Sequence, residues 1–181
     1  MVIPGKFNYD PAYTFVKIES TFFGVPVESY YDKLIGLRIK GKTSGIKAKV
    51  LQVLSSTKST PNSTTLYIKF ESTSDDLLNQ YFIDGENLVT LTDFTYGSTT
   101  ITSGSDFATC ILSNATGTAS SFTMNRGVFF ARGAFVEVAN ETLILDQYSN
   151  TPSYRVGFFV KEDVVTAVDD PSLYDNAAGF S

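Results

Sequence analysis

The chain contains no histidine, and its only cysteine is Cys110. Without histidine it lacks the usual general base, the Ser–His and Cys–His nucleophile pairs and the commonest transition-metal ligand. The single cysteine cannot form a disulfide within the chain, and the same counts exclude a structural zinc site of the Cys/His type. Cys110 lies in the apolar run 107–112, so we expect it to be a small buried hydrophobic residue. Any catalysis would have to use carboxylates, hydroxyls or lysines.

Positive charge is also scarce. Lys and Arg number 14 against 19 Asp and Glu, which gives a net charge of -5 at pH 7, and no basic run is longer than a few residues. This balance disfavours nucleic acid and anionic membranes as partners. Pro4 and Gly5 stand where a signal peptide needs apolar residues, and no segment approaches a membrane-spanning length, so we expect no membrane insertion.

Strand-like alternation of apolar and polar residues marks the first half of the chain. It occurs, with lysine on the polar face each time, in residues 37–40, 46–50 and 66–70. The composition of residues 41–45 and 55–64 predicts a turn and a hairpin loop. Residues 81–90 predict a strand, an Asp84-Gly85 turn and a second strand. We therefore expect a small antiparallel β-barrel-like module over residues 31–95.

A second module is expected over residues 96–181, as a β-meander or sandwich. Its strands are predicted at residues 127–131, 134–139, 142–146 and 154–161. Tight turns at Arg132-Gly133 and Asn140-Glu141 would join the first three strands, and the fourth would join the same sheet. The sequence stops at residue 181 without a terminating element, so we expect this module to continue in a longer protein.

The fold class that these patterns predict is all-β: a small antiparallel β-barrel followed by a β-meander or sandwich unit. The 181 residues, 43% of them hydrophobic, are enough to bury a core. Only short helices are expected, near residues 29–35, 75–80 and 171–178. Residues 1–30 are aromatic and irregular, and we expect them to form an N-terminal arm or packing segment.

Residues 36–43 match the phosphate-loop pattern G-x-x-x-x-G-K-[ST]. A working phosphate loop needs backbone N–H groups that curl around the phosphate and a helix that follows at once. Here the residues between the glycines alternate like a strand, residues 44–49 alternate as well, and no strand–helix–strand succession surrounds them. We therefore interpret the match as a two-strand hairpin that carries exposed lysines.

Carboxylates support two further hypotheses. Acidic residues within 162–176 offer the oxygen ligands that calcium or magnesium prefers, but their spacing fits no calcium loop, and a solvated loop with an Asp-Pro turn is the simpler interpretation. Two carboxylates held in one groove would be enough to hydrolyse a glycoside, although the sequence does not give their separation. We predict no cofactor, no metal site and no catalytic residue.

A family resemblance rests on residues 117–121, 127–138 and 142–157. These segments resemble an uncharacterised domain of tailed-bacteriophage structural proteins, of the kind found in large tail-fibre or baseplate proteins of contractile-tailed phages, notably those infecting cyanobacteria. Residues 170–181 are similar to the way that domain continues into further sequence. More loosely, residues 41–50 and 82–86 look like a small β-module that recurs in phage tail proteins.

The resemblance implies a virion structural protein of the tail fibre or baseplate. Its role would be assembly and attachment within the tail and host adsorption, without enzymatic activity, in a protein assembled in the host cytoplasm. Its partners would be other tail and baseplate proteins, and because phage fibres are commonly trimeric we expect a homotrimer. The alternative is a carbohydrate-engaging module, either a receptor-binding domain for host surface glycan or a polysaccharide depolymerase.

The aromatic N-terminal segment supplies the candidate interface. Tyrosine and phenylalanine are enriched at protein interfaces, so we expect this segment to pack across the barrel or onto a partner chain. The candidate interface residues are Tyr9, Tyr13, Phe15, Phe22 and Phe23. For the glycan alternative, the candidate stacking residues are Tyr9, Tyr13, Tyr30 and Tyr31.

Overall fold

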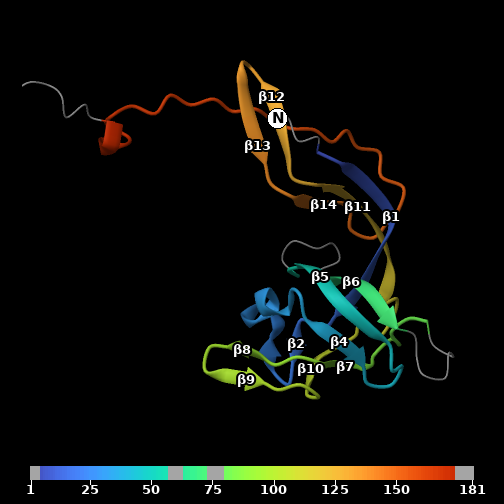
Figure 1. Ribbon diagram of the computed structural model, residues 1–181. Helices are drawn as coiled ribbons and strands as arrows, with labels where there is room; N and C mark the ends of the chain where they lie inside the picture. Colours follow the sequence, from blue (N-terminus) through green and yellow to red (C-terminus); the bar gives the residue numbers. More distant parts are fainter. Residues whose placement is uncertain (1–4, 57–62, 73–79, 174–181) are drawn as a thin grey trace, which may run out of the picture.

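A computed structural model describes residues 5–56, 63–72 and 80–173, and it confirms the all-β prediction (Figure 1). The described residues form one eight-stranded sheet, in the order β10-β7-β4-β5-β6-β1-β11-β14. They also form three two-stranded sheets, β12-β13, β2-β3 and β8-β9. The strands are β1 (Phe7–Ile18), β2 (Thr21–Phe22), β3 (Val25–Pro26), β4 (Arg38–Gly41), β5 (Lys47–Leu54), β6 (Thr64–Ser72), β7 (Asn87–Thr90), β8 (Phe94–Tyr96), β9 (Thr99–Ile101), β10 (Asp106–Thr109), β11 (Thr116–Met124), β12 (Gly127–Ala131), β13 (Ala134–Val138) and β14 (Glu141–Asp146).

The lower part of the molecule in Figure 1, called the body, is a curled sheet built from β10, β7, β4, β5, β6 and the second half of β1. Its two ends meet, because Ile18 at the end of β1 bridges Cys110, and the Glu19 N–H donates to the Thr109 carbonyl at 2.8 Å. The barrel-like arrangement therefore includes β1 and β10, which lie outside residues 31–95. The four strands within that range do not enclose the core by themselves.

The core of the body confirms the strand alternation predicted from sequence. Each strand of the curled sheet contributes fully buried apolar side chains, among them Val16, Ile39, Val50, Leu66, Leu88 and Phe107. One end is covered by the 3-10 turns η1 (Val27–Ser29) and η2 (Tyr31–Leu34), which occupy the helical segment expected near 29–35. Tyr30 anchors this cover, because its hydroxyl donates to the Phe107 carbonyl at 2.7 Å.

One predicted strand in this part of the chain is absent. Residues 81–83 form no strand, although the Asp84-Gly85 turn is present and β7 follows it as expected. The hairpin predicted across residues 55–64 is confirmed by the antiparallel pairing of β5 with β6, while residues 57–62 of its loop lie outside the described part. The helix expected near 75–80 also falls almost entirely outside that part.

The upper part of the molecule in Figure 1, called the arm, comprises residues 5–10 and 120–146. Its central feature is a long hairpin: Phe122 pairs with Leu143 in β11–β14, and Phe129 pairs with Val136 in β12–β13, in one continuous register. The predicted turn at Arg132-Gly133 is confirmed, with both residues at positive φ as a two-residue hairpin turn requires. The predicted turn at Asn140-Glu141 is wrong, because the chain runs straight on into β14, which pairs with β11.

The arm bends away from the body where two strands are bulged. β1 carries an extra residue against β11 between Asp10 and Tyr13, and β11 shifts register against β14 between Ser120 and Ser121. Pro11 lies in the first bulge, where it escapes the ladder hydrogen bond that it cannot donate. Bulges bend and twist the strands that contain them, so these two account for the change of direction visible in β1 (Figure 1).

Residues 151–165, called the strap, contain the strand predicted at 154–161, and that prediction is wrong. No residue from 147 to 166 pairs in a sheet. The strap instead crosses one face of the arm and then runs away from it toward the short 3-10 turn η3 (Pro171–Leu173), which lies far from every other element in Figure 1. η3 falls within the helix expected at 171–178, of which the structure describes only the first residues.

Candidate assembly surface

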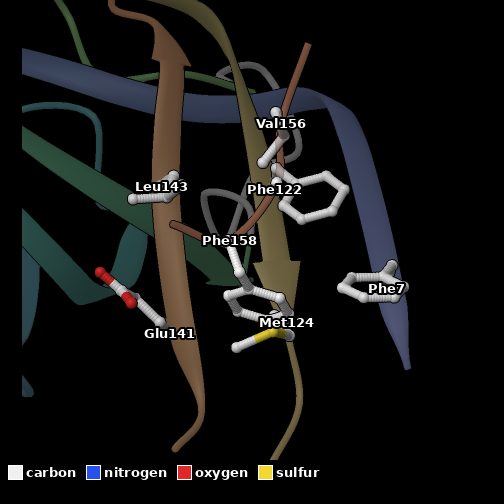
Figure 2. Close-up of a pocket in the computed structure, with 8 residues that line it drawn as sticks. Phe7, Phe122, Met124, Glu141, Leu143, Val156 and Phe158 are labelled. Atoms are coloured by element: carbon white, nitrogen blue, oxygen red, sulfur yellow. The ribbon is translucent and has the colours of Figure 1, made fainter. Parts of the chain in front are cut away.

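The arm carries an apolar face that its own chain covers only in part. Because side chains alternate along a strand, Phe7 of β1, Phe122 and Met124 of β11, and Leu143 of β14 lie on the same face. Val156 and Phe158 of the strap pass over this face and leave a cavity of about 380 Å³ between strap and sheet (Figure 2). Glu141 is the only charged residue among its lining residues.

A second, shallower hollow of about 360 Å³ adjoins the first and shares Phe122 and Val156 with it. Tyr9 and Tyr154 line this hollow together with Leu145 and Pro152. The Tyr9 hydroxyl donates to the Asn150 carbonyl at 3.1 Å, which ties the beginning of the strap to β1. The apolar face therefore extends along the length of β1, β11 and β14 in the arm.

The strap is attached firmly at its start and loosely beyond it. Just before it, the Tyr148 ring packs against Phe15 with ring centres 5.1 Å apart, and its hydroxyl lies 2.9 Å from the Thr65 hydroxyl. The Lys17 ammonium lies 4.5 Å from the centre of the Tyr148 ring, a cation–π contact. Farther along, Phe158 touches Phe129 with ring centres 5.0 Å apart, yet about half of its surface remains exposed.

Beyond the cavity, the tip of the arm and the strap expose large apolar side chains. Phe130 and Phe135 pair across the β12–β13 hairpin, and each is about two-thirds exposed. Phe159 is 92% exposed. Val164 and Val168, farther along the chain, are similarly open to solvent. A soluble monomer rarely exposes so many apolar side chains on one projecting element.

Apart from Glu141, the charged residues of the arm and strap do not line the cavity or the hollow beside it. Arg126 pairs with Glu137 at 2.5 Å, Arg132 with Glu162 at 3.4 Å, and Lys161 with Asp163 at 2.6 Å. The hydrogen bond that Arg126 donates to the Glu137 carboxylate raises the pKa of Arg126 above its ordinary value. Since all of these groups are well exposed, each pair contributes little to folding stability.

The five residues predicted to form an interface lie in three places. Tyr13 and Phe15 are buried within this chain, where Tyr13 stacks on Tyr67 at 5.3 Å, and burial raises the pKa of Tyr13 to about 12. Tyr9 lies on the apolar face of the arm, about half exposed. Phe22 and Phe23 contact each other at the β2–β3 turn of the body, away from the arm, with Phe23 largely exposed.

Sequence reasoning missed most of the arm's apolar face. Phe122, Met124, Leu143 and Phe158 were not among the candidate residues. The signal that was present is the alternation of Phe122 and Met124 with threonine, which is typical of a strand with one apolar face. What the alternation did not reveal is that no other element of the described chain covers that face closely.

The segment that matches a phosphate loop is the hairpin expected from its alternation. β4 ends at Gly41, the turn follows, and β5 begins at Lys47 without a helix. The backbone N–H groups of Thr43 and Ser44 both donate to the Glu86 carboxylate at 2.9 Å. The turn therefore cradles an anion that belongs to the chain itself, and Lys42 forms an ion pair with Asp106 at 2.7 Å. These contacts exclude a nucleotide-phosphate site at this turn.

Other chemical groups have structural partners. Cys110 is fully buried, and burial raises the pKa of its thiol. Asp169 accepts hydrogen bonds from the N–H and hydroxyl of Thr166, as expected of a solvated acidic turn. Within residues 5–56, 63–72 and 80–173, no group of three or more acidic or cysteine side chains is placed to hold a metal ion.

No family model, curated protein or solved structure matches the chain. In the part of the chain that the structure describes, no helix is long and apolar enough to cross a membrane. The candidate function therefore depends on the chain's own surfaces, and the apolar face of the arm, which carries both hollows described above, is the candidate surface.

Proposed function

We propose that this chain is a structural protein of a bacteriophage tail fibre or baseplate, which acts in tail assembly and host adsorption and is not an enzyme. The observation that carries the proposal is the apolar face of the arm, with its partly filled cavity and its loosely seated strap. Monomeric proteins rarely leave such a surface open, whereas subunits of permanent assemblies bury it between chains.

The composition of this surface supports assembly over a small-molecule site. Phenylalanine, tyrosine and methionine supply half of the residues that line the two hollows, and these residue types are enriched at the centres of protein interfaces. Two different parts of the chain, the hairpin tip and the far end of the strap, project beyond the cavity. A small-molecule or catalytic pocket is also largely apolar, but it holds a few polar groups that converge on the ligand. Here Glu141 is the only charged residue among those lining the larger cavity.

The body supports the same role because the carboxylates of Glu86 and Asp84 are hydrogen-bonded within the chain and serve its structure. Glu86 holds the β4–β5 turn, and the Asp84 carboxylate accepts hydrogen bonds from the N–H groups of Asn114 and Ala115 at 3.0 and 2.8 Å. The body is thus a closed support from which the arm projects. Most residues that resemble the phage tail domain, 117–121, 127–138 and 142–157, lie in the arm and the first part of the strap.

The direct test is the location of the protein in virus particles. Antibodies raised against the purified chain should label the tail or baseplate of purified virions in electron micrographs. Virions of a mutant phage that lacks the coding sequence serve as the control. Label that stays in the soluble fraction of an infected lysate, with none on purified virions, would contradict the proposal.

A carbohydrate-engaging module is the second candidate, and one observation favours it. Tyr9 and Tyr154 are both exposed and line the same shallow hollow, an arrangement in which tyrosine rings stack on sugars. If the hollow binds host glycan, Tyr9→Ala and Tyr154→Ala should each weaken calorimetrically measured binding of host surface polysaccharide. Tyr81→Ala, at an exposed tyrosine of the body, is the matched control. If calorimetry detects no binding of host surface polysaccharide to the unmutated chain, this candidate function is contradicted.

A further inference from the structure

The outer edge of β14 is an open strand edge with a distinct charge pattern. β14 ends the order of the eight-stranded sheet, and among the described residues only β11 pairs with it. Its middle residues, 143–145, are apolar, whereas Glu141 and Asp146 place a negative charge at each end. An exposed edge of this kind presents unpaired N–H and C=O groups to any strand that can align with it.

The strap contains an apolar run with a positive charge at each end. Residues 156–160 are apolar, apart from Gly157, and Arg155 and Lys161 flank them. Glu162 and Asp163 follow, and Lys161 forms an ion pair with Asp163 at 2.6 Å. The strap is extended, and none of its residues pairs in a sheet. Phe159 faces solvent, because its neighbour Phe158 faces the cavity and successive side chains of an extended segment point to opposite sides.

We propose that the strap of a second copy of this chain adds to the outer edge of β14 as an antiparallel strand. This inference rests on the proposed assembly function and names the partner surface. Every strand pair in the eight-stranded sheet is antiparallel, so the added strand continues the existing pattern. The register that places Lys161 opposite Glu141 also places Phe159 opposite Leu143.

Charge decides between this contact and a symmetric one. If two β14 edges paired with each other about a two-fold axis, Glu141 of one chain would lie opposite Asp146 of its partner, and directly opposed like charges destabilise a sheet. In the proposed register Glu141 instead faces Lys161, which has the opposite charge, so this repulsion is absent at Glu141. A contact between two different surfaces is head-to-tail. It forms a ring, such as a trimer, where the rotation between copies closes, and an open filament where it does not.

The pairing also accounts for the partly filled cavity. In the proposed register, Phe159 of the second copy lies on the face that Leu143 shares with Phe122. Leu143 and Phe122 both line the cavity. The second copy therefore supplies an aromatic ring beside a space that the chain's own strap leaves open, and it covers the exposed side of Phe159 in the same step.

Two variants that each add one cysteine to the native chain test the contact when they are mixed. Leu143→Cys and Phe159→Cys chains are expressed together, so that any disulfide between these positions must join two chains. We expect about tenfold more disulfide-linked dimer in the mixture than in either variant alone, since paired positions in adjacent strands lie within disulfide reach. The native Cys110 is fully buried and serves as an internal blank. A mixture of Leu143→Cys with Ile35→Cys, at an exposed position of the body, is the matched control.

Charge reversal gives a second readout. Glu141→Lys and Lys161→Glu should each weaken association about fivefold, and the double variant should restore it. If the chain is oligomeric but the Leu143–Phe159 cross-link does not exceed the Ile35 control, the inference is overturned. Failure of the charge-swapped double variant to recover association also counts against it. In both cases, antibody label on virion tails would still uphold the proposed function, so the two failures are distinguishable.

Discussion

At the scale of single residues, Glu86 is the buried charge on which the body depends most. Its side chain is almost fully buried and accepts hydrogen bonds from the N–H groups of Thr43, Ser44 and Ile83 and from the Ser44 hydroxyl. Gly41 is required beside it, because a Cβ there would overlap the Ser44 hydroxyl and lie 2.6 Å from the Glu86 carboxylate. This carboxylate occupies the place that phosphate takes in a true phosphate loop.

Loss of the Glu86 carboxylate should destabilise the body. Glu86→Ala leaves three buried or half-buried backbone donors without an acceptor, so we expect a cost of about 3 kcal/mol in the free energy of unfolding. Urea titration followed by tyrosine fluorescence measures it. Glu71→Gln, which breaks only the exposed pair with Arg38, is the control and should cost less than about 0.5 kcal/mol. Equal costs for the two variants would show that Glu86 does not organise the turn.

The acid dependence of stability follows from two carboxyl groups of the body. Burial acts to raise the pKa of Asp106, but hydrogen bonds from Lys42 and Asn87 outweigh it, so the pKa lies below its ordinary value. Burial likewise acts to raise the pKa of Glu28, but hydrogen bonds from Ser56, Ser55 and Thr64 lower it on balance. Both pKa values are lower in the folded chain than in the unfolded chain. The ionised carboxylates therefore stabilise the fold fully at pH values above the unfolded-state pKa values. This stabilisation is lost as the pH falls through the folded-state pKa values.

We therefore expect urea midpoints that are constant between about pH 5.5 and 7, where the chain has no histidine to titrate, and that fall below about pH 4. Asp106→Asn should reduce the fall, because the amide that replaces the carboxyl group does not titrate and one contribution is removed. A midpoint that changes across the neutral range, or an Asp106→Asn variant with an unchanged acid slope, would contradict this explanation.

At the scale of elements, β1 is the strand that joins body and arm. It pairs with β6 at one end and with β11 along most of its length. Within it, Phe15 lies opposite Gly117, and a Cβ at Gly117 would lie 2.6 Å from the Phe15 ring. The aromatic ring covers the glycine across the strand pair, so both strands pack closely at the point where the arm begins.

A larger residue at Gly117 should therefore be costly. We expect Gly117→Val to lower the free energy of unfolding by about 2 kcal/mol, because the added methyl groups displace the Phe15 ring. In a Phe15→Leu background the same substitution should cost clearly less, and a double-mutant cycle by urea titration measures the difference. A cycle that closes without a coupling energy would show that the ring does not constrain this position.

The apolar patterns in the sequence predicted the positions of most strands well, but they predicted less well which strands pair with each other. Alternation correctly located β4, β5 and β6, because a half-buried strand imposes a period of two on its residues. Apolar runs joined by a tight turn correctly located β12 and β13. The similar run in residues 154–161 does not form a paired strand, because it crosses a face of the sheet instead of joining its edge. Asn140-Glu141 has turn composition, yet the continuous register of β11–β14 and β12–β13 keeps the chain extended there.

At the scale of the whole molecule, the candidate surface could be predicted only in part. Tyr9 was identified from its aromatic surroundings, whereas Tyr13 and Phe15 of the same segment are buried by Tyr67 and Tyr148, which are distant in sequence. A local pattern does not distinguish an aromatic residue that packs within its chain from one that faces a partner. The long-range pairing of β1 with β11 decides which residues face outward.

The central claim is that the arm and strap form the contact between copies of the chain. Light scattering of the purified chain over a concentration series at neutral pH tests it most directly. We expect the mass of a closed oligomer, a trimer in the arrangement proposed here, that persists on dilution. A monomer at every concentration, with the arm and strap intact, would contradict the claim.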